Sequence, residues 1–385
     1  MKLMDNFIDY IEIENFKSFR HIELTGFKRI NLILGRPNVG KSNLIEALSL
    51  FSLPYFGYNK KKLNDIIRVD SPNGLFYEGR IEGLSFIIFK SAYKQSEEKD
   101  FKKNCTIAYD IKTGKLKFDI FVSSINNPWY GDVDPKARDG YYPMQDYRAV
   151  YTFNNVFKSI SNNEDKIAKK TMRKEESASA FGHGSFFFID FVKPYRYKSD
   201  TDFKSVPLQF LLPPSGENLM QVLEFLPEHR KTYAQWFRQY GLQLVLDKTS
   251  HSLKIQKDVA EDEVFQLPYS SIADTLQRII FYKTAVASNE NSILLFEEPE
   301  AHAFPPYIVE FTQEVIRSHT NQFFIVTHSP LIVQEFLEDA IDDTAIFMVD
   351  FKEGQTVIRG LTNKEIREVK EYGVDLFFNN ESYLP

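Results

Sequence analysis

The stretch Gly35-Arg-Pro-Asn-Val-Gly40-Lys41-Ser42 satisfies the pattern G-x-x-x-x-G-K-[ST], and it decides how the rest of the sequence is interpreted. It follows a nearly continuous apolar run, residues 29–34, which is typical of a strand buried on both faces. A helical pattern comes next, and its apolar residues share one face: Leu44, Ile45, Leu48 and Phe51. In this context, backbone N–H groups can surround an anion at a helix N-terminus. The sequence therefore predicts a phosphate-binding loop.

Two of the loop residues have specific expected roles. Lys41 is expected to reach the β- and γ-phosphates of a nucleotide, and Ser42 to place its hydroxyl on Mg²⁺. A nucleoside triphosphate with Mg²⁺ is therefore the expected ligand. A glycine–lysine turn that matches by chance is the competing interpretation, and the strand before and helix after it argue against it. The predicted nucleotide-binding residues are Gly35, Asn38, Val39, Gly40, Lys41, Ser42 and Asn43.

A second apolar strand, residues 292–296, ends in the two acids Glu297 and Glu298. Ligands of parallel sheets bind at the carboxyl ends of the strands. Glu297 is predicted to be a metal residue that holds the water shell of Mg²⁺. Glu298 is predicted to be catalytic, orienting the attacking water against the γ-phosphate. Taken alone, the two acids would be read as a solvated acidic turn.

A third apolar strand, residues 323–327, ends in His328. If this strand lies beside the acidic one, His328 can contact the γ-phosphate and report whether it is present, so it is a second predicted catalytic residue. A lone histidine after a strand is more often an ordinary loop residue.

The remaining pattern predicts an α/β fold with an insertion. Strands alternate with helices at both ends of the chain, which favours a parallel sheet. Candidate strands also lie at residues 86–89, 106–109 and 117–121. Residues 122–185 are predicted to be a largely helical insertion. Its charge run, residues 166–174, is interpreted as a solvated helix face rather than a nucleic-acid contact.

Composition limits the class of protein. The chain has 385 residues, 43% hydrophobic and 26% charged, as in a globular protein of two or three structural units. The net charge of −6 (47 minus 53) excludes a basic nucleic-acid coat but leaves room for a local basic groove. The single Cys105 excludes a disulfide framework. No apolar run approaches the about 18 residues of a membrane span, and no signal peptide is visible, so a soluble cytoplasmic protein is expected.

Together these motifs resemble the ABC-type ATPase fold, and more narrowly its OLD/RecF-like, AAA-labelled branch. The segment Ile11-Glu-Ile-Glu-Asn-Phe-Lys-Ser-Phe19 is similar to the I-x-N-F-x-S-F opening of that branch. Glu297-Glu-Pro-Glu-Ala-His302 is similar to its E-E-P-E-A-H motif, and Thr327-His-Ser-Pro330 to its switch strand. The resemblance implies an ATPase head with a mixed sheet and a helical lobe, plus a β-rich and helical insertion. The expected units are residues 1–99 and 205–385 for the head, and 100–204 for the insertion.

The sequence departs from the family at several positions. Glu297 stands where most P-loop ATPases carry aspartate, and no Q-loop glutamine follows the first helix. The signature L-S-G-G-Q is absent, and its counterpart is the stretch 269–278. By resemblance, Ser270 and Ser271 of this stretch reach across a dimer to the nucleotide of the partner.

The resemblance implies an ATPase that dimerises on nucleotide and switches a separately encoded effector, such as a nuclease or toxin, in bacterial phage defence. The chain lacks heptad runs, and the 57 residues after His328 (385 minus 328) are too few for the nuclease domain of OLD proteins. Asp132 and Asp134 are not expected to form a nuclease site. Two alternatives remain: a RecF-like DNA-repair ATPase that clamps DNA, and a non-catalytic scaffold whose dimer is fixed by ATP. Nucleic acid stays open as a further partner.

Overall fold

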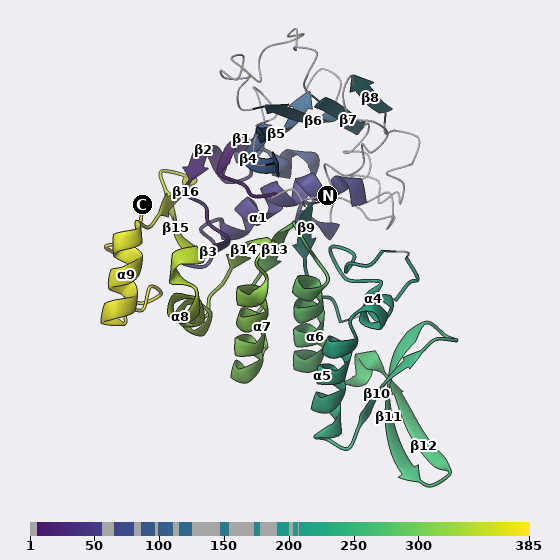
Figure 1. Cartoon of the computed structure of the whole chain (residues 1–385). Coiled ribbons are helices and arrows are strands. Elements are labelled where there is room, and N and C mark those ends of the chain that lie inside the picture. Colours follow the sequence, from purple (N-terminus) through teal and green to yellow (C-terminus); the bar gives the residue numbers. More distant parts are fainter. Residues whose placement is uncertain are drawn as a thin grey trace.

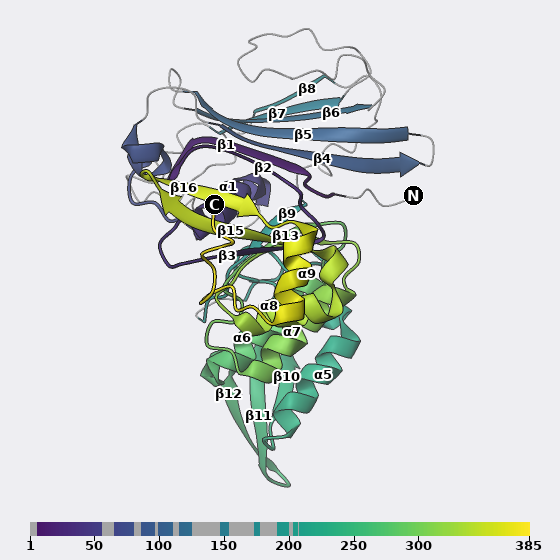
Figure 2. The same ribbon diagram turned by 90° about the vertical axis from the view of Figure 1, so that its left-hand side faces the viewer.

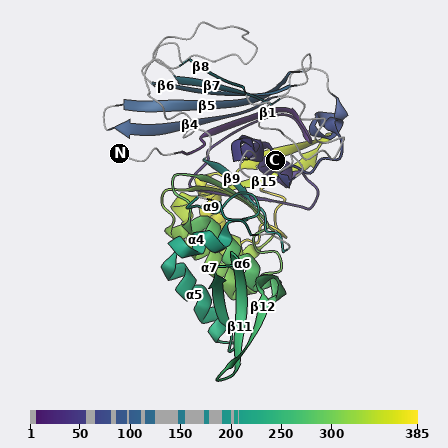
Figure 3. The ribbon, with the colours of Figure 1, turned by 90° about the vertical axis from the view of Figure 1, so that its right-hand side faces the viewer.

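The structure, a computed structural model, describes residues 6–55, 65–80, 86–96, 99–110, 115–124, 147–153, 173–177, 191–199, 203–206 and 208–385. Two sheets lie one above the other with helix α1 (Lys41–Ser49) between them, and a layer of helices covers the far face of the lower sheet (Figure 1). A third, three-stranded sheet projects at the end of the molecule opposite the upper sheet (Figures 2 and 3).

The lower sheet has six strands in the order β16-β15-β3-β14-β13-β9. All neighbouring pairs in it are parallel except β15 with β16. Because the parallel strands run the same way, their carboxyl ends meet at one edge. The predicted strands at residues 29–34, 292–296 and 323–327 are confirmed in this sheet. Its strands are β3 (Ile30–Gly35), β9 (Val192–Tyr195), β13 (Ile293–Glu297), β14 (Gln322–Val326), β15 (Thr344–Lys352) and β16 (Gln355–Gly360).

The upper sheet has seven antiparallel strands in the order β2-β1-β4-β5-β6-β7-β8. The candidate strands at residues 86–89, 106–109 and 117–121 are confirmed within β4, β5 and β6. Strand β5 pairs with β4 and begins at Lys99, so the predicted unit boundary after residue 99 falls inside β5, after its first residue. Its strands are β1 (Tyr10–Phe16), β2 (Phe19–Thr25), β4 (Phe86–Ser96), β5 (Lys99–Asp110), β6 (Lys115–Ser124), β7 (Tyr147–Phe153) and β8 (Arg173–Ser177).

The prediction of a largely helical insertion is wrong for the part of 122–185 that the structure describes. Those residues are strands: the end of β6, β7 and β8. Arg173 and Lys174, the end of the charge run, pair with Thr152 and Tyr151 of β7. Backbone pairing with an existing sheet edge therefore outweighs the local charge pattern. The rest of the charge run, Asp132 and Asp134 lie outside the described residues.

Helices cover the lower sheet on the side away from α1. The predicted helical zone 216–240 is two helices, because Pro227 has no N–H to continue the first one and begins the second. None of the described helices is long and apolar enough to cross a membrane. The remaining helices and strands are α4 (Leu219–Phe225), α5 (Pro227–Arg238), β10 (Gln243–Asp247), β11 (Ser252–Ala260), β12 (Glu263–Pro268), α6 (Asp274–Ala287), α7 (Pro305–Arg317), α8 (Pro330–Asp339) and α9 (Asn363–Tyr372).

Two hydrophobic cores hold these layers together. In the first, Leu44 and Leu48 of α1 belong to one buried cluster with Ile11 of β1 and Phe324 of β14. In the second, the opposite face of the lower sheet packs on α6, α7 and α8, and Phe296 meets Phe311 edge to face at 5.4 Å between ring centroids. The strands β3, β13 and β14 are thus buried on both faces, which explains their nearly uniform apolar sequences.

Candidate nucleotide-binding site

The predicted phosphate loop joins β3 to α1 at the carboxyl edge of the lower sheet. Asn38 and Gly40 both adopt positive φ, 64° and 95°, so the loop turns sharply before the helix. A Cβ at Gly40 would collide with the Thr356 hydroxyl and lie 2.6 Å from Ser18 Oγ, so no side chain fits there. A Cβ at Gly35 would collide with the carbonyl oxygen of Val349. The two glycines of the motif are therefore required by close approach of neighbouring groups.

Lys41, the first residue of α1, folds back over its own loop. Its Nζ donates to the carbonyl oxygens of Gly35 and Arg36, at 2.9 and 2.7 Å, and the residue is only 5% exposed. Burial lowers the pKa of the Lys41 ammonium, while the charges of Glu298 and Glu297 act in the opposite direction. The ammonium thus sits at the centre of the loop, within the field of both strand-end acids.

Two segments far away in the sequence support the loop. The Thr356 hydroxyl, at the start of β16, donates to the Val39 carbonyl oxygen at 2.7 Å and lies 2.6 Å from Ser18 Oγ. Asn43 Nδ2 on α1 also donates to Ser18 Oγ, at 2.6 Å. Ser18 belongs to a motif that is visible in the sequence, whereas no sequence motif marks Thr356. The loop is therefore fixed from outside by two hydroxyl groups.

Glu297 ends β13 beside the loop and is paired with two arginines. Arg196 Nη2 lies 2.7 Å from Glu297 Oε2, and Arg68 Nη2 pairs with Oε1. Burial alone would raise the pKa of the Glu297 carboxyl. A hydrogen bond from Ser42 and the charges of Arg196 and Arg68 outweigh burial and leave that pKa below its usual value. Glu297 is therefore ionised and in contact with Ser42, as a shared metal site requires.

The two arginines belong to a longer chain of charges that the sequence did not reveal. Arg68 Nε also lies 2.9 Å from Glu46 Oε1, and the other oxygen of this α1 carboxylate pairs with Lys17. Arg196 directly follows β9, and His328 comes two residues after the end of β14. Applying the strand-end rule to every parallel strand would have found Arg196. No comparable signal marks Arg68, which is 229 residues from Glu297 in the sequence.

Glu298 and His328 lie together at the same edge. His328 Nε2 is 3.6 Å from Glu298 Oε1, and both side chains are partly exposed. Burial lowers the pKa of His328, the positive charge of Lys41 lowers it further, and Glu298 partly offsets both. A neutral imidazole therefore stands beside a carboxylate that faces solvent.

Glu300 holds the residue before His328 and the backbone of His328 itself. Its Oε1 accepts from the Thr327 hydroxyl and from the His328 N–H, both at 2.7 Å. Its Oε2 is buried and has no hydrogen-bond partner among the described residues. Burial raises the pKa of Glu300, against the hydrogen bonds from His328 and Thr327. Glu300 is thus a positioning residue for the strand end that carries His328.

The serines of the signature counterpart lie on a separate element. Ser270 and Ser271 form the 3-10 turn η6 (Tyr269–Ser271) just before α6. Gln277 of α6 fixes this turn by donating to the Ile272 carbonyl oxygen at 2.9 Å. Within the described part of one chain, no hydrogen bond or ion pair joins this turn to the phosphate loop. Lys41, Ser42, Glu297, Glu298 and His328 are brought together, and the two serines are not.

The overall fold is similar to that of solved structures. An SMC head, solved bound to the C-winged helix domain of ScpA, superposes with a TM-score of 0.51 over 94% of this chain and 99% of that one, at 12% identity. The fold is that of an ABC-type ATPase head.

Sequence similarity to known proteins is local. A segment of 41 residues is 49% identical to an ATP/GTP phosphatase of Helicobacter pylori, covering 11% of each chain. A segment of 78 residues is 33% identical to the DNA replication and repair protein RecF of Rhizobium rhizogenes, covering 20% of each chain. The chain thus matches no more than a fifth of either relative. No protein-family model matches the sequence.

Proposed function

We propose that this chain binds ATP with Mg²⁺ at the edge formed by β3, β13 and β14, hydrolyses it, and dimerises on it. The observation that carries the proposal is the convergence of Lys41, Ser42 and Glu297 at one edge of an ABC-type head, with Glu298 and His328 alongside. Local similarity to an ATP/GTP phosphatase and to RecF supports it.

In this proposal, Ser42 and Glu297 would hold Mg²⁺, and the ion would neutralise charge that develops on the phosphates. Glu297 can accept the metal only by loosening its ion pairs with Arg196 and Arg68. Guanidinium groups bind phosphate oxygens in paired hydrogen bonds, so the released arginines can turn to the triphosphate. Before the nucleotide binds, the two arginines thus neutralise the charge of Glu297, and after binding they contact the triphosphate.

Glu298 and His328 act on the γ-phosphate side of the site. The exposed Glu298 carboxylate is suited to orient an attacking water as an acceptor. The lowered pKa keeps His328 neutral, so one ring nitrogen can donate to a phosphate oxygen without adding a full charge. Glu300 keeps His328 at this edge through the backbone.

The direct test is Lys41→Ala, because no other described ammonium takes its place in the loop. Phosphate release from Mg-ATP should fall by about 100-fold or more, and calorimetry should detect no Mg-ATP binding. Lys364→Ala, whose side chain is 86% exposed, is the matched control and should retain both. A Lys41→Ala protein with wild-type nucleotide affinity would refute the site.

We further propose that the nucleotide dimer switches a separate effector, as in the OLD-like phage-defence ATPases that the motifs resemble. The SMC head of similar fold was solved bound to a domain of another protein, which supports a head that acts through a partner. The switched protein could be identified by co-purification with the Glu298→Gln variant in ATP, with Lys41→Ala as the control. A partner retained equally by both variants would argue against nucleotide-controlled switching.

A RecF-like clamp on DNA is the second candidate, and the local identity to RecF favours it. DNA binding that weakens steeply with salt and requires ATP would support the clamp. Dimerisation on ATP without any phosphate release would instead support the non-catalytic scaffold.

A further inference from the structure

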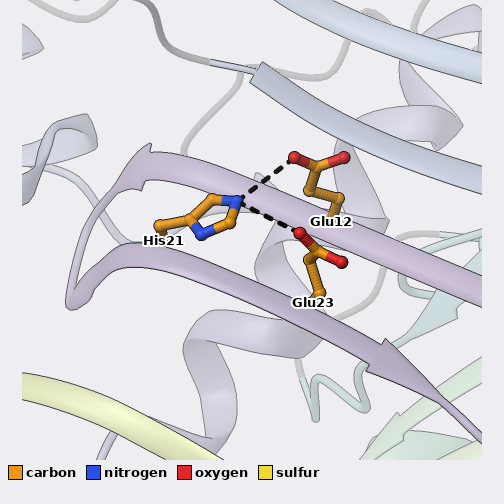
Figure 4. Close-up of side chains that lie close together, drawn as sticks. All are labelled: Glu12, His21 and Glu23. Atoms are coloured by element: carbon orange, nitrogen blue, oxygen red, sulfur yellow. Dashed lines mark hydrogen bonds and ion pairs between the residues drawn. The ribbon is translucent and has the colours of Figure 1, made fainter. Parts of the chain in front are cut away.

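The hairpin of β1 and β2 carries a group of polar side chains on its outer face (Figure 4). Glu12 comes from β1, and His21 and Glu23 come from β2, the edge strand of the seven-stranded sheet. The other face of the hairpin is buried in the first hydrophobic core through Ile11, Ile13, Ile22 and Leu24. The backbone that bears the three side chains is therefore firmly held.

The strand register brings their ligand atoms together. Glu12 and Glu23 are directly opposite each other across the two strands, an arrangement of like charges that is unfavourable without a cation. His21 Nε2 points between them, 3.2 Å from Glu12 Oε1 and 3.9 Å from Glu23 Oε1. One ligand atom from each residue lies within 4.8 Å of the other two.

A fourth side chain orients one of the carboxylates. The Tyr10 hydroxyl, two residues before Glu12 on β1, donates to Glu12 Oε2 at 2.9 Å. This hydrogen bond leaves Oε1 to face His21 and Glu23. Carboxylate ligands of metal ions are commonly fixed by such a partner on the second oxygen. Access from solvent is open, because the side chains of His21 and Glu23 are 49% and 57% exposed, and that of Glu12 is 20% exposed.

We propose that Glu12, His21 and Glu23 form a binding site for a divalent transition-metal ion, with Zn²⁺ as the best fit. Around a tetrahedral ion with bonds of about 2.1 Å, ligand atoms lie about 3.4 Å apart. The distance from His21 to Glu12 is close to this value, and that to Glu23 needs a shift of only about half an ångström. One imidazole and two carboxylates suit Zn²⁺ better than Mg²⁺, which prefers oxygen ligands and water. The remaining position is open to water or to a ligand from another molecule.

Such an ion would cross-link the edge strand β2 to β1 and reduce the electrostatic repulsion between Glu12 and Glu23. It would do so at the outer face of the upper sheet, with ligands separate from those of the nucleotide edge. The inference therefore does not depend on the proposed ATPase function, and it can fail or hold independently.

The test is calorimetric titration of the full chain with ZnCl₂, after treatment with a chelator and in the absence of nucleotide. The wild type should bind one Zn²⁺ at this site, and Zn²⁺ should raise its melting temperature. His21→Ala should weaken this binding by about 100-fold, and Glu23→Gln by at least about tenfold. His319→Ala, at an exposed histidine outside the cluster, is the matched control and should bind as the wild type does.

Co²⁺ provides a second readout that does not depend on affinity alone. Co²⁺ bound to the wild type and to His319→Ala should give the visible absorption of a low-symmetry site, and His21→Ala should lose it. Circular dichroism without metal should be the same for all variants, because the side chains face solvent. Zn²⁺ affinity and Co²⁺ absorption unchanged in His21→Ala, or wild-type binding no tighter than about 1 mM, would overturn the proposal and leave an ordinary ion pair.

Discussion

Arg196 Nη2 lies 2.7 Å from Glu297 Oε2, so the residue that follows β9 is paired with the last residue of the adjacent parallel strand β13. The acid expected to hold the metal is thus already neutralised by a cation of the same chain. Nucleotide and metal must exchange this pair for new contacts, and that exchange can be tested.

Replacing Arg196 by alanine should change Mg²⁺ affinity and the rate of hydrolysis in opposite directions. Phosphate release should fall by about 10- to 100-fold, because a charge-assisted contact to the triphosphate is lost. The Mg²⁺ concentration that gives half-maximal rate should also fall, because a competitor for Glu297 is removed. Arg196→Lys should restore the rate only in part, since an ammonium cannot make the paired contact. Steady-state rates across a Mg²⁺ series give both values. Arg238→Ala, at an exposed arginine of α5, should change neither; a normal rate in Arg196→Ala would show that the ion pair is only structural.

Thr356→Val should loosen the phosphate loop while keeping the shape of the side chain. The change removes the hydroxyl that donates to the buried Val39 carbonyl oxygen and makes a part-buried contact with Ser18 Oγ. Unpaired buried polar groups cost about 1–3 kcal/mol, and the free energy of unfolding in urea should fall by this amount. Mg-ATP affinity should fall with it. Thr249→Val, at an exposed turn, should stay within about 0.5 kcal/mol of the wild type. An equal decrease in the free energy of unfolding in both variants would mean that the Thr356 hydroxyl does not specifically stabilise the phosphate loop.

Glu300 should make folding stability depend on pH. Its folded pKa is raised above 4.5, so the folded state holds this proton more tightly than the unfolded chain. The resulting stability is present below about pH 4.5 and is lost as pH rises through the folded pKa. Glu300→Gln cannot ionise, so the free energy of unfolding of the wild type minus that of the variant should decrease with rising pH. Each unit by which the pKa is raised corresponds to about 1.4 kcal/mol.

The measurement is urea unfolding of both proteins at several pH values from 4.5 to 8. Glu371→Gln, at an exposed position of α9, is the control and should follow the wild type at every pH. A difference between the wild type and Glu300→Gln that is flat or rises with pH would contradict burial of an ionisable carboxyl at this position.

Sequence motifs predicted the part of the site whose structure is determined by residues nearby in the sequence. The loop from Gly35 to Ser42 is fixed by a buried strand and a helix next to it in sequence, and His328 by its place after a strand. Arg68 and Thr356 could not be found in this way, because they reach the site only through the packing of distant segments. The strand β8 was missed for a similar reason. Its sequence, RKEES, has no apolar alternation, and it is a strand only because β7 offers an edge to pair with.

Glu298→Gln tests whether the nucleotide is shared between two copies. The amide keeps the size of the side chain but cannot act as an anionic acceptor for the attacking water, so hydrolysis should stop while Lys41, Ser42 and Glu297 still bind. ATP would then remain between the loop of one copy and the turn of Ser270 and Ser271 of the other. A ligand that binds only the dimer shifts the equilibrium toward it. Adding Ser271→Arg should prevent the dimer, because the bulky side chain stands in the shared interface.

The most direct test of a shared nucleotide is light scattering on Glu298→Gln with and without Mg-ATP, together with a measurement of phosphate release. Glu298→Gln should have twice the monomer mass only with Mg-ATP and should release no phosphate, and its mass should not increase when Ser271→Arg is added. The same mass with and without Mg-ATP, or full hydrolysis by Glu298→Gln, would contradict sharing of the nucleotide.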